Sequence, residues 1–581
     1  MQFNLNRTVI SIVFTICFIF LSISASIIYI TRPNGYEVSI YSAVPLIAWF
    51  FLLLPLFFGI IISLREALTQ KTYREVIVNY QFLAGLCLIV ISGIIISSIP
   101  LIRGYYQWGR GDPISHLLWI QEIGLTGHLP ENLIYPLSHI YMVIAGLVTN
   151  LNNLAIMENY SLLISIPAIL FSFLFAKAFL GEKCAVIVLI ISISSSVGSL
   201  YFFAGTIPGY LFLLITYLFM ALIQQTGNTR TSFFILLTIL ICAIVPGHPN
   251  AVINSAIIMV IIFIFLKYEG YITKIQNHTS LVPFFVLFIA FFMWISQFYL
   301  LAKTLQKMRD IFIIQSDKSE IAILQQSIDY ASSYGYSWIE MFCKIYGRTA
   351  IILFISMFAL YIYYKENQKI KKRIALILIL SFVFIFCTGI LYLTYVGFGP
   401  ERIFSIAIMF SSLLMVLVLY YIRDRKYTFK NIHFPAQLFI ISLVIGLCVM
   451  GIPTKYSSPY LLQHNDQYTL NEKMGTDWFI SYTHEEPVYF LGLDTMKRYG
   501  FNQNDPPYHF GYNSNYQFGD VITKNSFYIS NKLDHLIYID IFSKIAPIRY
   551  QPKDFERLES DISIQKYYTN GETEIRYIIK L

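Results

Sequence analysis

Long apolar runs alternate with short polar segments along most of this 581-residue chain. A helix needs about 20 apolar residues to cross a bilayer. Candidate spans fall at about 9–30, 42–64, 79–102, 160–180, 184–204, 209–225, 232–247, 250–266, 281–300, 349–364, 374–394, 401–422 and 435–453. The first run is as long as a span needs to be, so it predicts an uncleaved anchor rather than a signal peptide. The pattern therefore predicts about thirteen transmembrane helices.

Residues 135–149 form a further apolar stretch, and the topology depends on whether this stretch crosses the membrane. If it crosses, the 14 Lys and Arg of the short loops between Lys177 and Lys430 face outward. Such loops normally face the cytoplasm. The stretch is therefore predicted to be an interfacial helix. The N-terminus is then cytoplasmic and the C-terminus extracytoplasmic, in a multi-pass protein of the cell membrane.

Composition supports a polytopic membrane protein over a soluble one. Hydrophobic residues make up 56% and charged residues 13% of the chain, with a mean hydropathy of +0.62. Soluble globular domains carry about 25% charged residues. The net charge is +8, but residues 455–581 hold 13 Lys and Arg against 16 Asp and Glu. The excess of basic residues thus lies in the apolar part, where it orients loops, and it predicts no nucleic-acid partner.

The change in composition near residue 455 predicts two domains. Residues 1–454 form the transmembrane part, with outer loops at 103–149 and 301–348, and residues 455–581 form a small soluble α/β domain. Within the soluble part, TLNEKMGTDWFISY and DFERLESD are typical of helices, and PVYFLGL, NSFYIS, HLIYID and EIRYIIKL are typical of strands. The loop 301–348 has the pattern of one or two amphipathic helices or of a solvated connection. All seven cysteines precede residue 455, so no disulfide framework is expected in the soluble domain.

The segment 103–140 is a polar island, broken by Gly and Pro, between apolar runs. Within it, Asp112 followed by Pro113 predicts a helix N-cap and first turn, with the helix ending at Gly124. The same carboxylate is placed to act as a general base toward an acceptor hydroxyl. His116 follows by four residues, on the same helical face, where it either tunes Asp112, binds substrate or is a plain interfacial histidine.

Two further outer loops carry ionisable residues. His248 lies in the tight PGHPN break between two spans, as a turn residue or as a ligand of a substrate. Arg402 lies in GFGPERIF, where an outer loop enters a span; its planar guanidinium suits a phosphate, or it pairs with Glu401. The sequence contains no HExxH motif and no Cys/His cluster. No cofactor is expected, and a divalent metal is left open.

The sequence GDPISHLLWIQEIGLTGHLP, then YPLSH, then FAKAFLGEKCAVIVLIISIS, resembles archaeal and bacterial members of the GT-C superfamily of membrane glycosyltransferases, over about residues 100–210. The tail segments PPYHFGYNSN and DFERLESD also resemble archaeal members. The resemblance implies a GT-C-like helical bundle and makes Asp112 the acidic residue of the first large outer loop, the proposed base. Tyr135, Pro136 and His139 match the YP..H segment of the second interfacial helix. Arg402 falls where several members keep a basic residue for the donor phosphate.

Departures from the family narrow what the resemblance implies. A single acidic residue stands at position 112, without the paired acids of protein mannosyltransferases or the DxD of oligosaccharyltransferases. The WWDYG motif that reads the glycosylation sequon is absent as well, and two extra spans precede the expected first one. The resemblance therefore does not imply oligosaccharyltransferase activity.

Together, these features lead to the hypothesis of an inverting transferase that moves a sugar from polyprenyl phosphate to a glycan, lipid or protein acceptor at the outer face. Asp112 would deprotonate the acceptor, and Arg402, with Arg110 or His248, would stabilise the departing lipid phosphate. The predicted substrate-binding residues are Arg110, His116, Tyr135, His139, His248, Glu401 and Arg402. The alternatives are a non-catalytic transporter or flippase for lipid-linked glycans and a membrane anchor for the outer domain.

Overall fold

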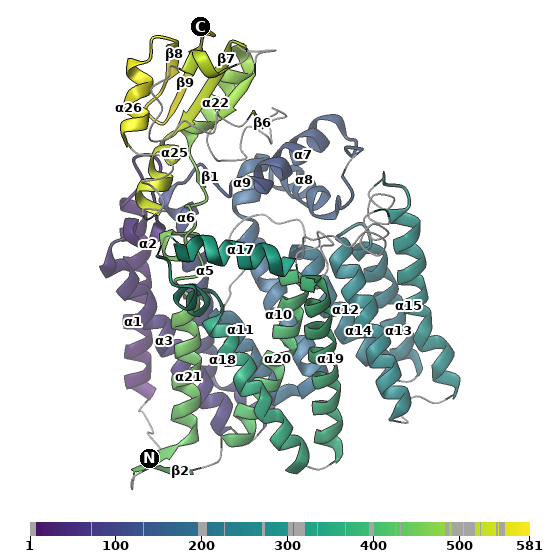
Figure 1. Cartoon of the computed structure of the whole chain (residues 1–581). Coiled ribbons are helices and arrows are strands. Elements are labelled where there is room, and N and C mark those ends of the chain that lie inside the picture. Colours follow the sequence, from purple (N-terminus) through teal and green to yellow (C-terminus); the bar gives the residue numbers. More distant parts are fainter. Residues whose placement is uncertain are drawn as a thin grey trace.

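The computed structural model describes residues 7–581 except 71, 132, 196–205, 226, 270–273, 300–305, 307–319, 334, 366–367, 394–399, 424–425, 430–431, 483–486, 491–502, 505–517, 523, 542–543 and 545–551. In this part of the chain a bundle of long helices carries a layer of short helices and a small sheet at one end (Figure 1).

A helix forms within each predicted span. The bundle consists of α1 (Arg7–Ile30), α3 (Leu46–Thr69), α5 (Tyr80–Ser97), α10 (Tyr160–Leu180), α11 (Glu182–Ser195), α12 (Thr206–Gln224), α13 (Gly227–Ile244), α14 (Pro249–Tyr268), α15 (Lys274–Ile295), α18 (Trp338–Lys365), α19 (Gln368–Leu393), α20 (Pro400–Ile422) and α21 (Ala436–Gly451). Of the helices in the described residues, eight are long and apolar enough to cross a membrane. The polytopic helical fold class is thereby confirmed, whereas the total of thirteen spans stays a prediction.

The bundle packs around one apolar core, and small residues bring its helices together. Between α3 and α5, a Cβ atom on Gly59 would lie 2.7 Å from the Gly85 carbonyl oxygen, and one on Gly85 would lie 2.5 Å from the Ser63 hydroxyl. Such close approach favours van der Waals packing between helices in an apolar solvent.

The polar island and the residues that flank it form a layer above the bundle. This layer contains α6 (Ile99–Arg103), β1 (Gln107–Trp108), α7 (Asp112–Thr126), α8 (Leu137–Thr149) and α9 (Asn153–Glu158). Helix α8 packs on α7 and α9, above the ends of α12 and α14, on the same side as the C-terminal sheet (Figure 1). This arrangement is the one expected of an interfacial helix, and its depth in the membrane stays a prediction.

Shorter elements connect these parts. They are α2 (Ile40–Ala43), α4 (Tyr73–Val78), α17 (Glu320–Ser333), the hairpin of β2 (Lys426–Phe429) and β3 (Ile432–Pro435), the 3-10 turn η1 (Pro459–Leu461) and β4 (Gln467–Tyr468). In the predicted loop 301–348, α17 and the start of α18 are helical, while 301–305 and 307–319 lie outside the described residues.

The C-terminal part has the predicted α/β fold. Its sheet has the order β6-β5-β7-β9-β8, with β5 parallel to β6 and β7, and β9 antiparallel to β7 and β8. The elements are α22 (Leu470–Tyr482), β5 (Val488–Phe490), β6 (Gln503–Asn504), α24 (Phe518–Val521), β7 (Ser526–Asn531), α25 (Lys532–Leu536), the π-turn η2 (Ile537–Ile541), α26 (Pro552–Ser560), β8 (Ile564–Thr569) and β9 (Thr573–Ile578).

Both faces of this sheet are buried, as the alternation along β7 requires. Phe527 and Ile529 pack with Phe479 of α22 on one face, and Tyr528 packs with Phe555 of α26 on the other. Because successive side chains of a strand point to opposite faces, one helix is needed on each side.

Two details of the sequence analysis are wrong. The stretch HLIYID is not a strand but continues from α25 into η2, where Leu533 and Ile541 bury against Tyr36. The helix after Asp112 does not end at Gly124 but at Thr126, because Gly127 adopts the left-handed conformation, with φ of 71°, that closes it.

Candidate functional site

Asp112 is the first residue of α7, and its side chain is exposed. The predicted N-cap role is wrong, because the N-cap is Gly111, which has a φ of 73°. Gly109 also has a positive φ, 109°. Positive φ values are easy only for glycine, so these two residues permit the sharp turn that begins the helix. The carboxylate of Asp112 consequently lies at the positive end of the α7 dipole, facing away from the bundle core.

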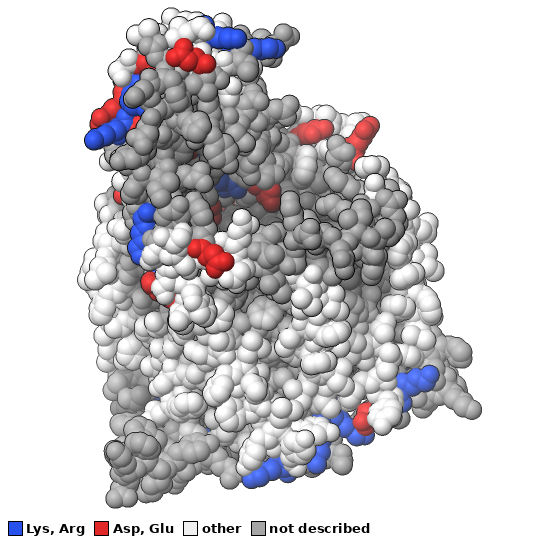
Figure 2. Space-filling model, in the orientation of Figure 1, with Lys and Arg blue, Asp and Glu red and all other residues white. Residues whose placement is uncertain are grey.

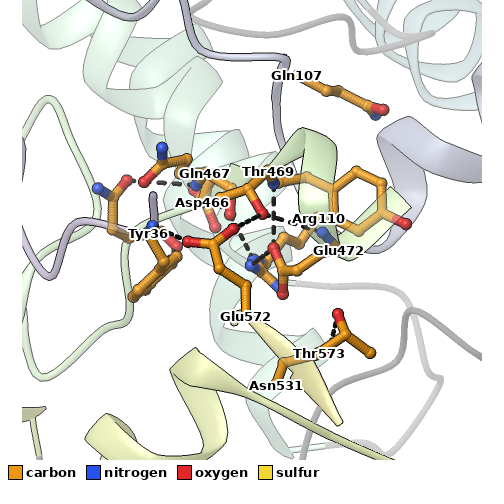
Figure 3. A network of polar contacts seen from close by, with 12 residues as sticks. Tyr36, Gln107, Arg110, Asp466, Gln467, Thr469, Glu472, Asn531, Glu572 and Thr573 are labelled. Carbon is orange, nitrogen blue, oxygen red and sulfur yellow. Dashed lines mark hydrogen bonds and ion pairs between the residues drawn. The ribbon is translucent and has the colours of Figure 1, made fainter. Parts of the chain in front are cut away.

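The segment before Asp112 is bound to the C-terminal domain. Strand β1 pairs with β4, and the Gly109 amide donates to the Asp466 carbonyl at 2.9 Å. The Arg110 Nε donates to the Gln467 carbonyl at 2.7 Å, and the Arg110 guanidinium forms an ion pair with Glu472 (Figure 3). Both side chains of the ion pair are buried, with 4% and 2% of their surface exposed.

Three distant parts of the chain meet around this ion pair. The Thr469 amide donates to Glu472 at 3.0 Å, and the Thr469 hydroxyl donates to Glu572 (Figure 3). Glu572 in turn accepts from the Tyr36 amide, in the loop after α1. Burial alone lowers the pKa of a guanidinium, but the Glu472 carboxylate outweighs this and raises the pKa of Arg110. Arg110 thus lies in the junction between the bundle and the C-terminal domain, and its role in substrate binding stays a prediction.

A buried carboxyl group lies beneath the same segment. Both oxygens of Glu158, at the end of α9, lie 3.1 and 3.2 Å from the Trp108 amide that donates to them. Burial raises the pKa of Glu158 from 4.5 to about 8, and the bond from Trp108 opposes this only in part. Glu158 is therefore mostly protonated at neutral pH in the folded protein.

This proton gives stability a definite pH dependence. Between pH 4.5 and about 8 the folded carboxyl keeps a proton that the unfolded chain has released, so stability falls as pH rises through that window. Burial also raises the pKa of Asp534, to about 8, and this shift lowers stability over the same rise in pH. Glu158→Gln, which still accepts from Trp108, should reduce the loss of Tm between pH 5 and 8, as measured by scanning fluorimetry. Glu122→Gln, at an exposed position of α7, should leave the loss of Tm between pH 5 and 8 unchanged. If Tm falls equally with pH in the wild type, Glu158→Gln and Glu122→Gln, the raised pKa does not belong to Glu158.

His116 and His139 form a buried pair between α7 and α8. Nδ1 of His116 lies 3.0 Å from Nε2 of His139, and the rings of Trp119 and Tyr135 surround them. Burial, reinforced by His116, lowers the pKa of His139 to about 3. His116 thus faces the interior of the layer while Asp112 is exposed. The pair holds the two helices together, and its predicted contact with substrate is not tested.

Under α8, the PGHPN turn leads into a pocket of about 510 Å³. His248 is the N-cap of α14, and its Nδ1 accepts from the Asn250 amide at 3.3 Å. Its ring lies 5.3 Å from that of Tyr135, which joins the pocket to the histidine pair. Burial, and secondarily Arg402, lowers the pKa of His248 to about 4. At neutral pH the imidazole is therefore uncharged, with its proton on Nε2.

Helices α12, α14 and α20 form the walls of this pocket. It is lined by Thr206, Gly209, Tyr210, Phe212, Leu213, His248, Asn250, Ala251, Asn254, Arg402, Ser405, Ile406 and Met409. Arg402 is the third residue of α20 and is exposed, as is Glu401 beside it. Among the described residues, no carboxylate, including that of Glu401, lies within ion-pair distance of Arg402.

Asn254 is a pocket residue that the sequence analysis missed. Its side chain is buried, with 5% of the residue exposed, and its Oδ1 has no hydrogen-bond partner in the described part of the chain. A buried polar atom without a partner is costly unless a ligand or water supplies one. Two asparagines, Asn250 and Asn254, lie in the apolar run at 250–266, but the sequence does not show which of them is buried without a partner.

The structure brings some of the predicted residues together and separates others. His248 and Arg402 share the pocket, and Tyr135, His139 and His116 adjoin it. Asp112 and Arg110 do not line it; they lie on the outer layer and at its junction with the C-terminal domain. In the described residues, no three His, Cys, Asp or Glu side chains group to hold a metal ion. The tail segment PPYHFGYNSN lies outside the described residues.

The bundle, the outer layer, the pocket and the appended α/β domain define a polytopic membrane protein with a candidate site at one end of its helices. No family model and no curated protein matches the chain.

Among solved structures, the chain is similar to the archaeal oligosaccharyltransferase AglB from Archaeoglobus fulgidus. One structure, in complex with an inhibitory peptide and a dolichol-phosphate, shows 11% identity and a TM-score of 0.44 over 71% of this chain and 63% of that one. The oligosaccharyltransferase of the same organism in complex with Zn and sulfate shows 10% identity and a TM-score of 0.46, over 84% and 72% of the two chains. Its apo form shows 11% identity and a TM-score of 0.46, over 84% of this chain and 74% of that one.

The chain spans less than two thirds of the length of the first of these proteins. With identities of 10–11% and TM-scores below 0.5, the similarity assigns no activity to this chain.

Proposed function

We propose that this protein is a membrane glycosyltransferase of the GT-C type, using a sugar linked to polyprenyl phosphate. The observation that carries the proposal is the pocket between α12, α14 and α20. It combines apolar walls with the guanidinium of Arg402 and with the buried amide of Asn254. A ligand with an apolar tail and an anionic head suits such a pocket.

The chemistry of the pocket favours a phosphate ester. A guanidinium donates to phosphate oxygens in a planar fork, and the Nε2 proton of neutral His248 adds a further donor. The Oδ1 of Asn254 accepts, so it suits a hydroxyl group of the ligand. Apolar residues such as Leu213 and Met409 line the same space, where the start of a polyprenyl chain would lie.

The proposed reaction is a single inverting displacement. The acceptor hydroxyl gives its proton to the Asp112 carboxylate, and its oxygen forms a bond to the anomeric carbon of the sugar. The bond from that carbon to the phosphate oxygen breaks, and its electron pair leaves with the lipid phosphate. Arg402 stabilises the charge that this phosphate gains, as preorganised cations do for developing anions.

The location of these groups suits transfer at the membrane surface. Helix α7, which begins at Asp112, lies at the end of the bundle that carries the C-terminal sheet (Figure 1), and the first turns of α12, α14 and α20 line the pocket. The positive-inside pattern predicts that this end is extracytoplasmic. The acceptor, a glycan, lipid or protein, would then approach from outside the cell. The C-terminal domain lies beside the same layer.

Replacing Arg402 tests the donor site. Arg402→Gln should weaken donor binding by about 10- to 100-fold, the effect of losing charge-assisted hydrogen bonds. Arg402→Lys should recover only part of this, because a lysine keeps the charge without the fork. The measurement is KM for a polyprenyl-phosphate sugar in detergent micelles.

Arg32→Gln is the matched control, since Arg32 is an exposed cation that stacks on Tyr29, 4.4 Å from the ring centre, and lies outside the pocket. It should leave KM unchanged. An unchanged KM in Arg402→Gln as well would remove Arg402 from the donor site.

A further inference from the structure

A second pocket, of about 670 Å³, lies among the helix ends on the side of the bundle away from the C-terminal domain. It is lined by Lys177, Ala178, Phe179, Tyr217, Met220, Ala221, Ile223, Gln224, Gln225, Phe233, Phe265, Leu266, Lys372, Arg373 and Leu376. These residues belong to the last turns of α10, α12 and α14 and to the first turns of α13 and α19. Lys and Arg gather at this end on the face that Figure 2 shows.

The pocket is basic. Among the described residues, three cations from α10 and α19 line it, and no carboxylate does. Lys177 pairs with Glu182 at 2.9 Å, with 36% and 46% of the two side chains exposed, and Lys372 pairs with Glu269. The Lys177–Glu182 pair is the more exposed of the two, and exposed ion pairs contribute little, so a ligand can compete for Lys177.

Arg373 differs from the two lysines. Its Nη1 donates to the Leu180 carbonyl at 3.3 Å, and no carboxylate pairs with it among the described residues. Among the described residues, three cations line the pocket and two carboxylates pair with them, and the surplus positive charge attracts anions.

The other lining residues favour a lipid over a soluble anion. Phe179, Phe233 and Phe265 provide apolar walls, and the amide of Gln224 offers hydrogen bonds beside the cations. The pocket opens where the apolar spans end, which is the level of the lipid head groups. Basic pockets between transmembrane helices on the cytoplasmic side are suited to anionic lipids.

We propose that this pocket binds the phosphate head group of an anionic membrane lipid. The phosphate lies among Lys177, Lys372 and Arg373, and the glycerol and acyl carbons lie along the aromatic walls. This site is separate from the donor pocket, and it does not depend on the proposed glycosyl transfer.

The test uses the purified full-length protein in nanodiscs of phosphatidylcholine, with and without phosphatidylglycerol. Phosphatidylglycerol should raise Tm, and native mass spectrometry should detect retained anionic lipid. The double variant Lys177→Gln/Arg373→Gln should bind this lipid about tenfold or more weakly, because each basic residue near an anionic lipid contributes appreciably. Arg74→Gln, an exposed cation of α4, should behave as the wild type.

Other outcomes would overturn the proposal. An unchanged lipid-dependent shift in the double variant would place the binding elsewhere. An equal shift with inorganic phosphate in phosphatidylcholine nanodiscs would make the site one for a soluble anion. Lys177→Arg/Arg373→Lys keeps the charges and should retain binding, which separates a loss of charge from a folding defect. If the double variant does not fold, Arg373→Gln alone serves the same comparison.

Discussion

Asp112→Asn is expected to reduce sugar transfer by about 10²- to 10⁴-fold, the usual contribution of a general base. The amide has nearly the same shape as the carboxylate but does not accept a proton from the acceptor hydroxyl. Asp112 is exposed at the first position of α7, where its interaction with the helix dipole contributes about 0.3–1 kcal/mol. The variant should therefore fold and insert normally. The measurement is the initial rate of product formation at saturating donor.

Two comparisons make this result specific to Asp112. Glu122→Gln removes an exposed carboxylate near the other end of α7 and should leave the rate unchanged. Donor binding by Asp112→Asn should also be unchanged, because Asp112 does not line the pocket that holds Arg402. Full activity in Asp112→Asn would mean that this carboxylate has no catalytic role and only stabilises the start of α7. A loss of donor binding would show that it acts on the lipid phosphate rather than on the acceptor.

Breaking the Arg110–Glu472 ion pair is expected to cost about 3–5 kcal/mol of stability, since removal of one partner leaves the other charge buried. Both side chains are almost completely buried. Arg110→Ala should lower Tm strongly and expose the C-terminal domain to limited proteolysis. Glu472→Gln should cost less, because its amide oxygen still accepts from Arg110.

The control lies on the same helix. Lys473 of α22 pairs with Asp477, one turn on, and that carboxylate is half exposed. Lys473→Gln should therefore change stability by less than about 1 kcal/mol. If Arg110→Ala and Lys473→Gln have equal small effects, the junction in Figure 3 is not what holds the C-terminal domain to the bundle.

The junction also gives the C-terminal domain a structural connection to the proposed base. Only Gly111 separates Arg110 from Asp112, and Arg110 bonds to Gln467 and Glu472 of the C-terminal part. A shift of that domain would move the start of α7. No chemistry was assigned to residues 455–581 from their sequence, and this contact explains how they can matter without supplying a catalytic group.

Much of the fold follows from sequence pattern because membrane spans are set by local composition. Every predicted span contains a helix, and the amphipathic stretch at 470–482 forms α22. The prediction of a strand at HLIYID was wrong because a short apolar run fits a buried strand and a buried helix equally well. Here Leu533 and Ile541 pack on Tyr36, more than 490 residues earlier in the chain, and not on the sheet.

The site was predictable only where topology decides it. The predicted topology placed the loops of His248 and Arg402 at the same end of the bundle, and the two residues line one pocket. The partner of Arg110 was not predictable, since Glu472 lies 362 residues away in sequence. Asn254 was missed because burial without a partner is a property of packing, which no local pattern records.

The most direct test of the central claim is to incubate the purified protein with a panel of polyprenyl-phosphate sugars and candidate acceptors, and to measure release of the lipid phosphate. The wild type should turn over at least one donor, and Asp112→Asn and Arg402→Gln should not do so at the same donor concentration. Binding of a donor without turnover in the wild type, together with its transfer across a vesicle bilayer, would contradict glycosyl transfer and identify a flippase.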